Sequence, residues 1–362
     1  MTRRDSKARL RGIVGCLAAV ALLAAGASWS ETLLVVRKTD NALDLVDPGS
    51  GLKLATVELG FAPHEVSVSP DGRLAVVSNY GTRERPGSTL SLIDLETARE
   101  IRRIDLSPHT RPHGVSWHAP GQIAVTAEGS MSLLLVDPDP GSVRAAIETG
   151  QQVSHMVAVD AAGTRAYVAN IGSGTTTVLD LESGRKIEDL PTGEGSEAIA
   201  LTPDGRQLWV GARSAGHISI VDTGSLEIVD RIPVAGVPIR IAITADGRTA
   251  LVSCAGSSEL VAFDIASRKE RARRKVDVPL APDAAERPFA GLAPGSALPV
   301  GLTLAANGSS VYVAATMADR IVQYDLVRLD PIRVIEVNGE PDGMATTTVM
   351  PRATCHGCDP PQ

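Results

Sequence analysis

The chain has 362 residues, a formal net charge of −7, 43% hydrophobic residues and 3% aromatic residues. This composition is typical of a globular protein. The acidic charge argues against nucleic acid or an anionic membrane as a partner, because both attract basic surfaces. Only three Trp, four Tyr and three Phe are present to stack on bases.

Residues 1–30 have the pattern of a secretory signal peptide. A basic segment, Arg3 to Arg11, precedes an apolar segment from Gly12 to Gly26, and small residues allow cleavage after Ser30. A lipobox ending at Cys16 and a twin-arginine signal are weaker alternatives, because the expected flanking apolar residues are missing. We therefore predict a periplasmic or secreted protein.

Cleavage after Ser30 would make the protein more acidic. It removes five basic residues and one acidic residue, which leaves 30 Lys and Arg against 41 Asp and Glu, a net charge of −11. No later stretch is long and apolar enough to cross a bilayer, so we expect no membrane span. We also expect a monomer.

An Asp at the end of an apolar run recurs seven times along the rest of the chain. The spacings between its copies are 47, 43, 43, 42, 42 and 61 residues. The copies are Asp47, Asp94, Asp137, Asp180, Asp222, Asp264 and Asp325. We expect each side chain to cap the turn that follows it by accepting hydrogen bonds from backbone N–H groups, without a catalytic role.

Between these Asp residues, apolar and polar positions alternate with a period of two, which predicts β-strands. The 42-residue stretch from Glu194 to Ala235 holds four such runs, and Asp204-Gly205 between the first two is a hairpin signal. Four antiparallel strands in a repeat of this length form one blade of a β-propeller.

The repeat predicts an all-β fold, a seven-bladed β-propeller with four antiparallel strands per blade. Only six first-strand turns accompany the seven Asp residues, and residues 341–346 continue the register at the carboxyl end. We therefore expect a C-terminal strand to complete the N-terminal blade and close the ring. The predicted domains are a signal peptide over 1–30, the propeller over 31–350 and a tail over 351–362.

Two insertions and the cysteines lie outside this regular pattern. Extra residues occur at 80–87 and at 277–298, and each insertion could be functional or merely a mobile surface loop. Cys254 is expected to be a small buried apolar residue. Cys355 and Cys358 form a C-x-x-C pair, for which a disulfide is the default in an oxidising compartment and metal capture the alternative.

The repeat resembles the YVTN family of bacterial β-propellers, including YncE-like proteins. The resemblance rests on Tyr167-Val168-Ala169-Asn170, on Val76-Val77-Ser78-Asn79 and on the Pro-Asp-Gly turns, and it covers residues 32–349. The pattern Pro63-His64 followed by Pro70-Asp71-Gly72 is also similar to the seven-bladed lactonase family. The resemblance implies the fold, whereas a function must be argued from a site.

One position of the repeat carries a cluster of ligand-type residues. When the blades are aligned on the turn Gly, the residue at the start of the first strand is, around the ring, Asp342, His64, His113, His155, Glu197, Ile239 and Val300. Three of the seven His residues of the chain occupy this position. We expect the position to lie where the innermost strand enters the central channel.

Imidazoles and carboxylates that converge in this way suit one divalent transition metal, Zn²⁺, Cu²⁺ or Fe²⁺. The predicted metal ligands are His64, His113, His155, Glu197 and Asp342. The alternative is that the His residues were inherited by duplication and only bond neighbouring backbone carbonyls.

The loop after the second strand adds residues at the same face. Glu128 is a candidate general base or a partner that orients an imidazole. We expect Asn79, Arg83 and Arg213 to bind a ligand at the rim, although a single surface Arg is more often only solvated.

Three functions fit these observations. The first is a periplasmic propeller that binds a metal ion, a small ligand or a periplasmic partner protein at the face lined by His64, His113 and His155. The second is a propeller that only mediates protein interactions, and the third is a metal-assisted, lactonase-like hydrolase.

Overall fold

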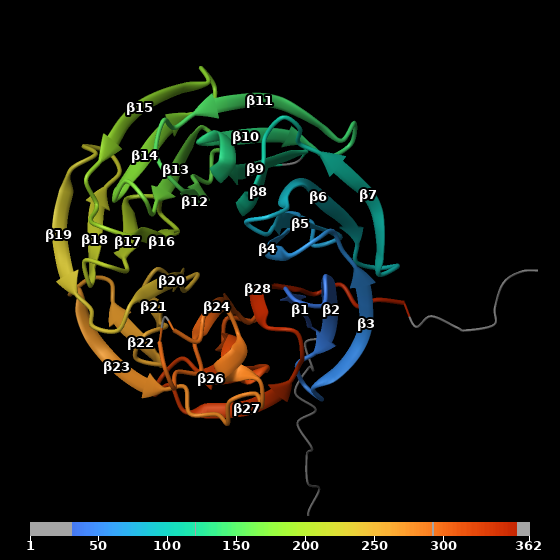
Figure 1. Ribbon diagram of the computed structural model, residues 1–362. Helices are drawn as coiled ribbons and strands as arrows, with labels where there is room; N and C mark the ends of the chain where they lie inside the picture. The colour runs from blue at the N-terminus through green and yellow to red at the C-terminus, as the bar shows by residue number, and fades with distance from the viewer. Residues whose placement is uncertain (1–30, 120, 292, 353–362) are drawn as a thin grey trace, which may run out of the picture.

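The computed structural model describes residues 31–119, 121–291 and 293–352. These residues form 28 β-strands and three short 3₁₀ helices. The strands form seven four-stranded antiparallel sheets arranged around a central channel (Figure 1). The predicted seven-bladed β-propeller is therefore confirmed.

Each blade has its innermost strand at the channel and its outermost strand at the rim. Blade 1 comprises β28 (Pro341–Thr347), β1 (Thr32–Arg37), β2 (Ala42–Asp47) and β3 (Leu52–Glu58). Blade 2 comprises β4 (Pro63–Val68), β5 (Leu74–Gly81), β6 (Pro86–Asp94) and β7 (Arg99–Asp105). Blade 3 comprises β8 (Pro112–Ala119), β9 (Gln122–Ala127), β10 (Ser132–Asp137) and β11 (Ser142–Glu148), with η1 (Glu128–Ser130) after β9.

The remaining blades repeat this order. Blade 4 comprises β12 (Ser154–Val159), β13 (Arg165–Asn170), β14 (Thr175–Asp180) and β15 (Arg185–Leu190). Blade 5 comprises β16 (Ser196–Leu201), β17 (Gln207–Ala212), β18 (His217–Asp222) and β19 (Ile228–Pro233). Blade 6 comprises β20 (Pro238–Ile243), β21 (Thr249–Cys254), β22 (Glu259–Asp264) and β23 (Lys269–Lys275). Blade 7 comprises β24 (Pro299–Leu304), β25 (Ser310–Ala315), β26 (Arg320–Asp325) and β27 (Pro331–Glu336), with η2 (Ala284–Glu286) before β24 and η3 (Thr316–Ala318) after β25.

The ring closes within blade 1, as predicted. β28 pairs with β1 in an antiparallel register that includes Leu34 opposite Ala345. The Thr32 hydroxyl also donates to the carbonyl of Val349 at 2.8 Å. The two ends of the described chain therefore hold each other, and β1 has a partner on both sides.

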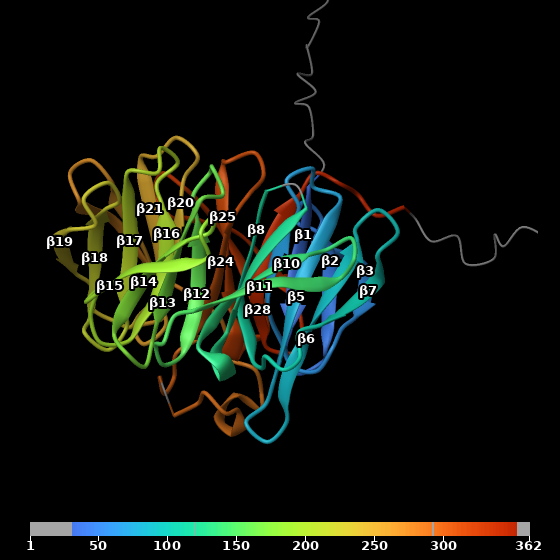
Figure 2. The same cartoon turned by 90° about the horizontal axis from the view of Figure 1, so that it is seen from above.

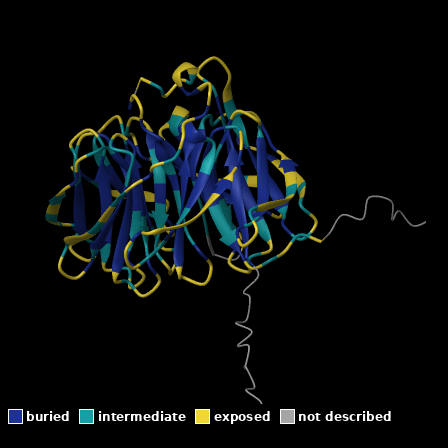
Figure 3. Cartoon of the chain, turned by 90° about the horizontal axis from the view of Figure 1, so that it is seen from below, coloured by how far each residue is buried: buried dark blue, intermediate teal, exposed yellow. Residues whose placement is uncertain are grey.

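The apolar core lies between neighbouring blades. Both faces of a blade pack against other blades, so the middle strands are buried at nearly every position, whereas outer strands such as β3 are largely exposed (Figure 3). Between blades 5 and 6, for example, Trp209 packs with Phe263 at 6.4 Å between ring centroids. Burial of both faces explains why the middle strands read as continuous apolar runs.

The side chain of the Asp that ends the third strand caps the following turn in every blade except blade 3, where Asp137 accepts no such hydrogen bond from the described residues. Asp222 accepts hydrogen bonds from the backbone N–H groups of Gly224 and Ser225 at 3.0 and 2.8 Å. These hydrogen bonds, chiefly the one from Ser225, lower the pKa of the carboxyl group.

Both insertions lie on one face of the propeller, together with η1 (Figure 2). Residues 80–87 form the tip of the long β5–β6 hairpin, whose strands have 8 and 9 residues. Residues 277–298, which we call the strap, connect blade 6 to blade 7. No helix among the described residues is long and apolar enough to cross a membrane.

Candidate functional site

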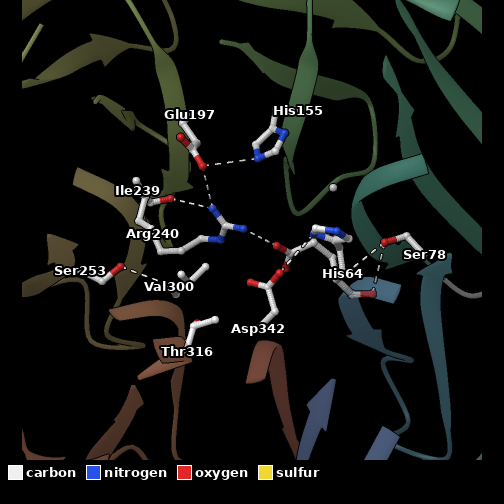
Figure 4. A network of polar contacts seen from close by, with 12 residues as sticks. His64, Ser78, His155, Glu197, Ile239, Arg240, Ser253, Val300, Thr316 and Asp342 are labelled. Atoms are coloured by element: carbon white, nitrogen blue, oxygen red, sulfur yellow. Dashed lines mark hydrogen bonds and ion pairs between the residues drawn. The ribbon is translucent and has the colours of Figure 1, made fainter. Parts of the chain in front are cut away.

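The seven equivalent positions identified in the sequence line one cavity at the channel. Each is the second residue of an innermost strand, and all seven contact a cavity of about 120 Å³. They are Asp342, His64, His113, His155, Glu197, Ile239 and Val300. The alignment of the repeats therefore predicted which side chains meet, and Figure 4 shows several of them around the channel.

A β-bulge directs these side chains. In all seven blades the register between the first two strands shifts near the start of the innermost strand. In blade 6, Pro238 lies opposite Cys254, but Arg240 lies opposite Ser253. The extra residue bends the strand, so the third residue of β20, Arg240, lines the cavity as well as the second.

Arg240 joins opposite sides of the channel. Its guanidinium bonds the carboxylate of Glu65 in blade 2 and lies 3.4 Å from a carboxylate oxygen of Glu197 in blade 5 (Figure 4). Burial opposes the charge of Arg240, but the charges of Glu65 and Glu197 outweigh burial and raise its pKa. This buried network holds three blades in a fixed relation.

Sequence reasoning missed Arg240 and Glu65, although a signal was present. Both are the third residue of an innermost strand, where the other blades have small or apolar residues: Gly114, Met156, Ala198, Gly301 and Gly343. Two charges of opposite sign at a position that is otherwise uncharged point to a pair across the channel.

His155 lies between two carboxylates. Its Nδ1 is 2.6 Å from Glu128, and its Nε2 is 3.4 Å from Glu197. Burial alone would lower the pKa of His155, but the hydrogen bonds to Glu128 and Glu197 raise it to about 9. Burial alone would raise the pKa of Glu197, but His155, Arg213 and Arg240 lower it to about 2. His155 is therefore a cation at neutral pH.

Glu128 lies where an orienting partner was expected. It accepts hydrogen bonds from His155 and from the Tyr80 hydroxyl, the latter at 2.6 Å. Both oxygens of the Glu128 carboxylate are thus hydrogen-bonded to side chains of the two neighbouring blades. A catalytic role for Glu128 remains a prediction, and this geometry favours orientation of the imidazole.

His113 stacks on His155 with 3.6 Å between ring centroids. Burial, followed by the positive charges of His155 and His64, holds the pKa of His113 well below its ordinary value. The ring is therefore neutral. Its Nδ1 is buried and has no hydrogen-bond partner among the described residues.

Blade 1 contributes a cation and a carboxylate side by side. The Nζ of Lys38 is 3.5 Å from Oδ2 of Asp342, and Nδ1 of His64 is 3.1 Å from the same oxygen. Burial would raise the pKa of Asp342, but Lys38 and His64 outweigh burial and hold it well below the usual range. Oδ1 of Asp342 has no hydrogen-bond partner within the described part of the chain.

The part of the cavity wall next to blade 1 is apolar. It consists of Ile239 and Val300 from the ring and of Phe289 and Leu298 from the strap. The ring of Phe289 also covers the ammonium group of Lys38, with 4.6 Å from Nζ to the ring centroid. The ring positions are therefore polar in blades 1 to 5 and apolar in blades 6 and 7, and Arg240 adds a charged group from blade 6.

The strap is attached to the propeller by Arg287, whose side chain is 7% exposed. The guanidinium binds Asp319 at 2.7 Å and donates to the carbonyl of Thr316 at 2.9 Å. It also binds Asp283 within the strap at 2.8 Å. The described part of the strap is therefore packed on the propeller and forms part of the cavity wall, and a functional role for this insertion stays a prediction.

The three residues predicted to bind a ligand lie in different places. Arg213 lines the cavity and donates to Glu197 at 2.8 Å. Asn79 is buried at the end of β5, where its amide donates to Thr89 and Ser91 at 3.0 Å. Arg83 is exposed on the β5–β6 turn. The structure therefore brings only Arg213 to the His residues.

The side chains, as they are arranged, do not fit a metal ion. The described residues contain no group of three or more His, Cys, Asp or Glu side chains that could hold one. The two nitrogens of His155 face carboxylates, and His113 presents its ring face to His155. Metal binding by His64, His113, His155, Glu197 and Asp342 therefore stays a prediction that this geometry does not favour.

The predicted signal peptide and the Cys355/Cys358 pair lie outside the described residues. Cys254 is buried, as expected, and burial raises the pKa of its thiol to about 12. An unreactive packing role follows from that environment.

Comparison with known families supports the resemblance found in the repeat. Residues 110–286 match the model of the YNCE-like β-propeller family. No curated protein sequence matches the chain. The YncE-like character predicted from the sequence is thus confirmed by a match over blades 3 to 6.

Solved structures share the fold at low sequence identity. A functionally unknown protein from Desulfotomaculum acetoxidans has a TM-score of 0.72 and 13% identity, over 88% of this chain and 99% of that chain. Hydrazine synthase from Kuenenia stuttgartiensis has a TM-score of 0.68 and 17% identity, over 83% and 93%. The periplasmic gluconolactonase PpgL from Pseudomonas aeruginosa has a TM-score of 0.68 and 18% identity, over 88% and 99%. At these identities the likeness concerns the fold.

Proposed function

We propose that this protein is an exported propeller that binds a small organic ligand in the channel cavity lined by His64, His113 and His155. One observation carries the proposal: two buried polar atoms in the cavity wall, Nδ1 of His113 and Oδ1 of Asp342, have no partner among the described residues. His113 is 3% exposed and Asp342 is 2% exposed.

Unsatisfied atoms of this kind are rare in folded proteins, because losing water without gaining a partner costs about 1–3 kcal/mol per group. Two of them around one cavity indicate that a molecule in the cavity supplies the missing hydrogen bonds. Ordered water could fill the space between uses, since a water needs only about 10–15 Å³ of such volume.

A small molecule fits this site better than a partner protein. The cavity measures about 120 Å³ and is partly walled by the strap residues Phe289 and Leu298. A protein surface reaches such a recess only with a single side chain. Export is supported by the basic and apolar segments of residues 1–30.

The test is a binding screen on the protein secreted by its own signal. Ligand-observed NMR with a library of small acids, alcohols, amines and lactones would be run beside the variant Val300→Trp, which fills the cavity with an indole. We expect binding that the variant abolishes, while its unfolding transition remains cooperative. If nothing in the library binds, or if the variant binds equally well, the channel cavity is not the site.

A lactonase-like hydrolase is the second candidate, and the neutral ring of His113 favours it. A neutral imidazole with an unpaired nitrogen can accept a proton from water, and the neighbouring cations Lys38 and Arg213 can stabilise an oxyanion. Turnover of lactones or esters by the purified protein, lost in His113→Gln, would establish this activity. Binding without turnover across the same panel would leave the protein as a binder.

A further inference from the structure

The chemistry of the cavity wall narrows the class of ligand, on the premise that the channel cavity is a ligand site. We propose that it binds small 2-hydroxy monocarboxylic acids with a short hydrocarbon side chain. The proposal rests on the neighbouring Lys38 and Asp342, on the apolar wall beside them and on the size of the cavity.

Lys38 provides the site for the carboxylate. Its side chain is 8% exposed, and its charged contacts are at 3.5 Å from Asp342 and 4.0 Å from Glu340, longer than good hydrogen bonds. An ammonium group has three donors. The described residues accept no good hydrogen bond from the ammonium group of Lys38. A ligand carboxylate in the cavity would accept these hydrogen bonds instead.

Asp342 provides the site for a donor beside that carboxylate. Its Oδ1 is the unpaired acceptor, and its Oδ2 is the atom 3.5 Å from Lys38. Two ligand groups that bind such close neighbours must themselves be adjacent. A hydroxyl on the carbon next to the carboxylate satisfies this condition.

The charge around Asp342 favours a hydroxyl over an ammonium group at this position. The charges of Lys38 and Arg240 already offset that of the carboxylate, and both lower its pKa. A further cation would be repelled by these two groups, whereas a neutral O–H donor would not. The site should therefore distinguish 2-hydroxy acids from 2-amino acids.

The apolar wall determines the rest of the ligand. Ile239, Val300, Leu298 and Phe289 present hydrocarbon, so a polyol such as a sugar acid would lose hydrogen bonds to water without replacement. The cavity of about 120 Å³ leaves room for only a short hydrocarbon side chain beside the polar groups.

The test uses isothermal titration of the intact secreted protein. The reference probe is 2-hydroxy-3-methylbutanoate. Three probes each change one feature: 3-methylbutanoate lacks the hydroxyl, 2-amino-3-methylbutanoate replaces it with an ammonium group, and 2-hydroxy-3-methylbutanamide lacks the charge. Because a hydrogen bond to a charged group contributes about 1.5–3 kcal/mol, we expect each of these changes to weaken binding about 10- to 100-fold. Gluconate keeps the carboxylate and the 2-hydroxyl but carries a longer polyhydroxylated chain, and we expect it to bind more weakly because the apolar wall cannot bond its hydroxyls.

Two variants locate the contacts. Lys38→Met should lose the preference for the acid over the amide, and Val300→Ser should lose the preference for the branched acid over gluconate. Lys53→Met, which changes an exposed Lys on β3, is the control and should alter neither preference. The series of ligands needs only the unaltered protein, so it decides the matter even if a variant fails to fold.

The outcomes separate this proposal from the one on which it rests. If the hydroxy acid does not bind while another class in the NMR library does, the ligand class is wrong and the cavity remains a binding site. Equal or tighter binding of the amino acid or of gluconate also overturns the proposed class. If no molecule binds in either experiment, both proposals fail.

Discussion

His113 and His155 stack face to face at 3.6 Å, and the two rings differ in charge at neutral pH. The difference arises from their partners. His155 has a carboxylate at each nitrogen, whereas Nδ1 of His113 has none among the described residues. A neutral ring on a charged ring avoids the repulsion that two imidazolium ions would have at this distance.

The first prediction concerns the pH dependence of stability. The pKa of His155 is raised from 6.5 to about 9 in the folded protein, so its stabilising contribution is complete below about pH 6.5 and is lost as the pH rises through 9. We expect the free energy of unfolding to fall between these values, and we expect His155→Gln to remove that fall. Denaturant titrations from pH 6 to pH 9.5 measure the free energy of unfolding of both proteins.

The pH dependence of stability below about pH 6.5 provides the matched control. The pKa of His113 is lowered, so the unfolded chain binds the proton more readily and stability from this group decreases below about pH 6.5. His113→Gln should therefore change the acid limb of the profile and leave the alkaline limb intact. An unchanged alkaline limb in His155→Gln would show that His155 is not the charged ring.

The second prediction concerns the ion pair across the channel. Arg240→Met leaves the buried carboxylates of Glu65 and Glu197 without their common cation, and loss of one partner of a buried pair costs about 3–5 kcal/mol. Urea denaturation at pH 7 measures the loss. Arg268→Met breaks a half-buried pair with Asp230 near the surface and should cost at most about 1 kcal/mol. Equal losses would mean that the channel network is not a structural element.

The fold could be predicted because the same sequence pattern recurs in each blade of a propeller. The Asp that ends the third strand and the turn Gly recur seven and six times, so an error in one blade is corrected by the others. The same alignment located the cavity residues, since Asp342, His64 and Glu197 occupy one structural position despite their different chemistry. Closure by β28 followed from counting first strands.

The pairing of side chains could not be predicted in this way. Arg240 and Glu65 are 175 positions apart, and only the closed ring brings them together. Asn79 shows the opposite failure, because the register places it opposite Pro63 just as Ala127 lies opposite Pro112, one residue before the position of Glu128. Its amide therefore bonds the neighbouring strand β6 instead of reaching the cavity. A shift of one residue at a strand end turns a side chain to the other face, and the spacing of the repeat was not precise enough to exclude that shift.

The third prediction concerns the spacing of the innermost strands. A Cβ on Gly301 would lie 1.9 Å from the backbone carbonyl oxygen of Asp342, which cannot move without the whole of β28. Gly301→Ala should therefore separate blades 7 and 1 and destabilise the protein by about 1–3 kcal/mol or more. Thermal unfolding measures the effect.

Gly291→Ala is the matched control for this change. Among the described residues other than its chain neighbours, no atom lies within 4 Å of a Cβ at position 291, so the substitution should be nearly neutral. Displacement of Asp342 should also weaken ligand binding in Gly301→Ala. Full stability of this variant would contradict the close approach of β24 and β28.

The last prediction concerns the attachment of the strap. Arg287→Ala removes the contacts to Asp319 and to the carbonyl of Thr316, which join the strap to blade 7. The strap should then detach while the seven blades stay folded, because none of these contacts lies within a sheet. A protease specific for aromatic residues should cut after Phe289 more rapidly in this variant, and Phe289 should no longer shield Lys38 in the cavity.

Arg320→Ala, which breaks a pair with the exposed Glu336, is the control and should leave the cleavage rate unchanged. If Arg287→Ala is cut no faster than the unaltered protein, the apolar contacts of Leu298 and Ala284 with Ile239 are sufficient to hold the strap.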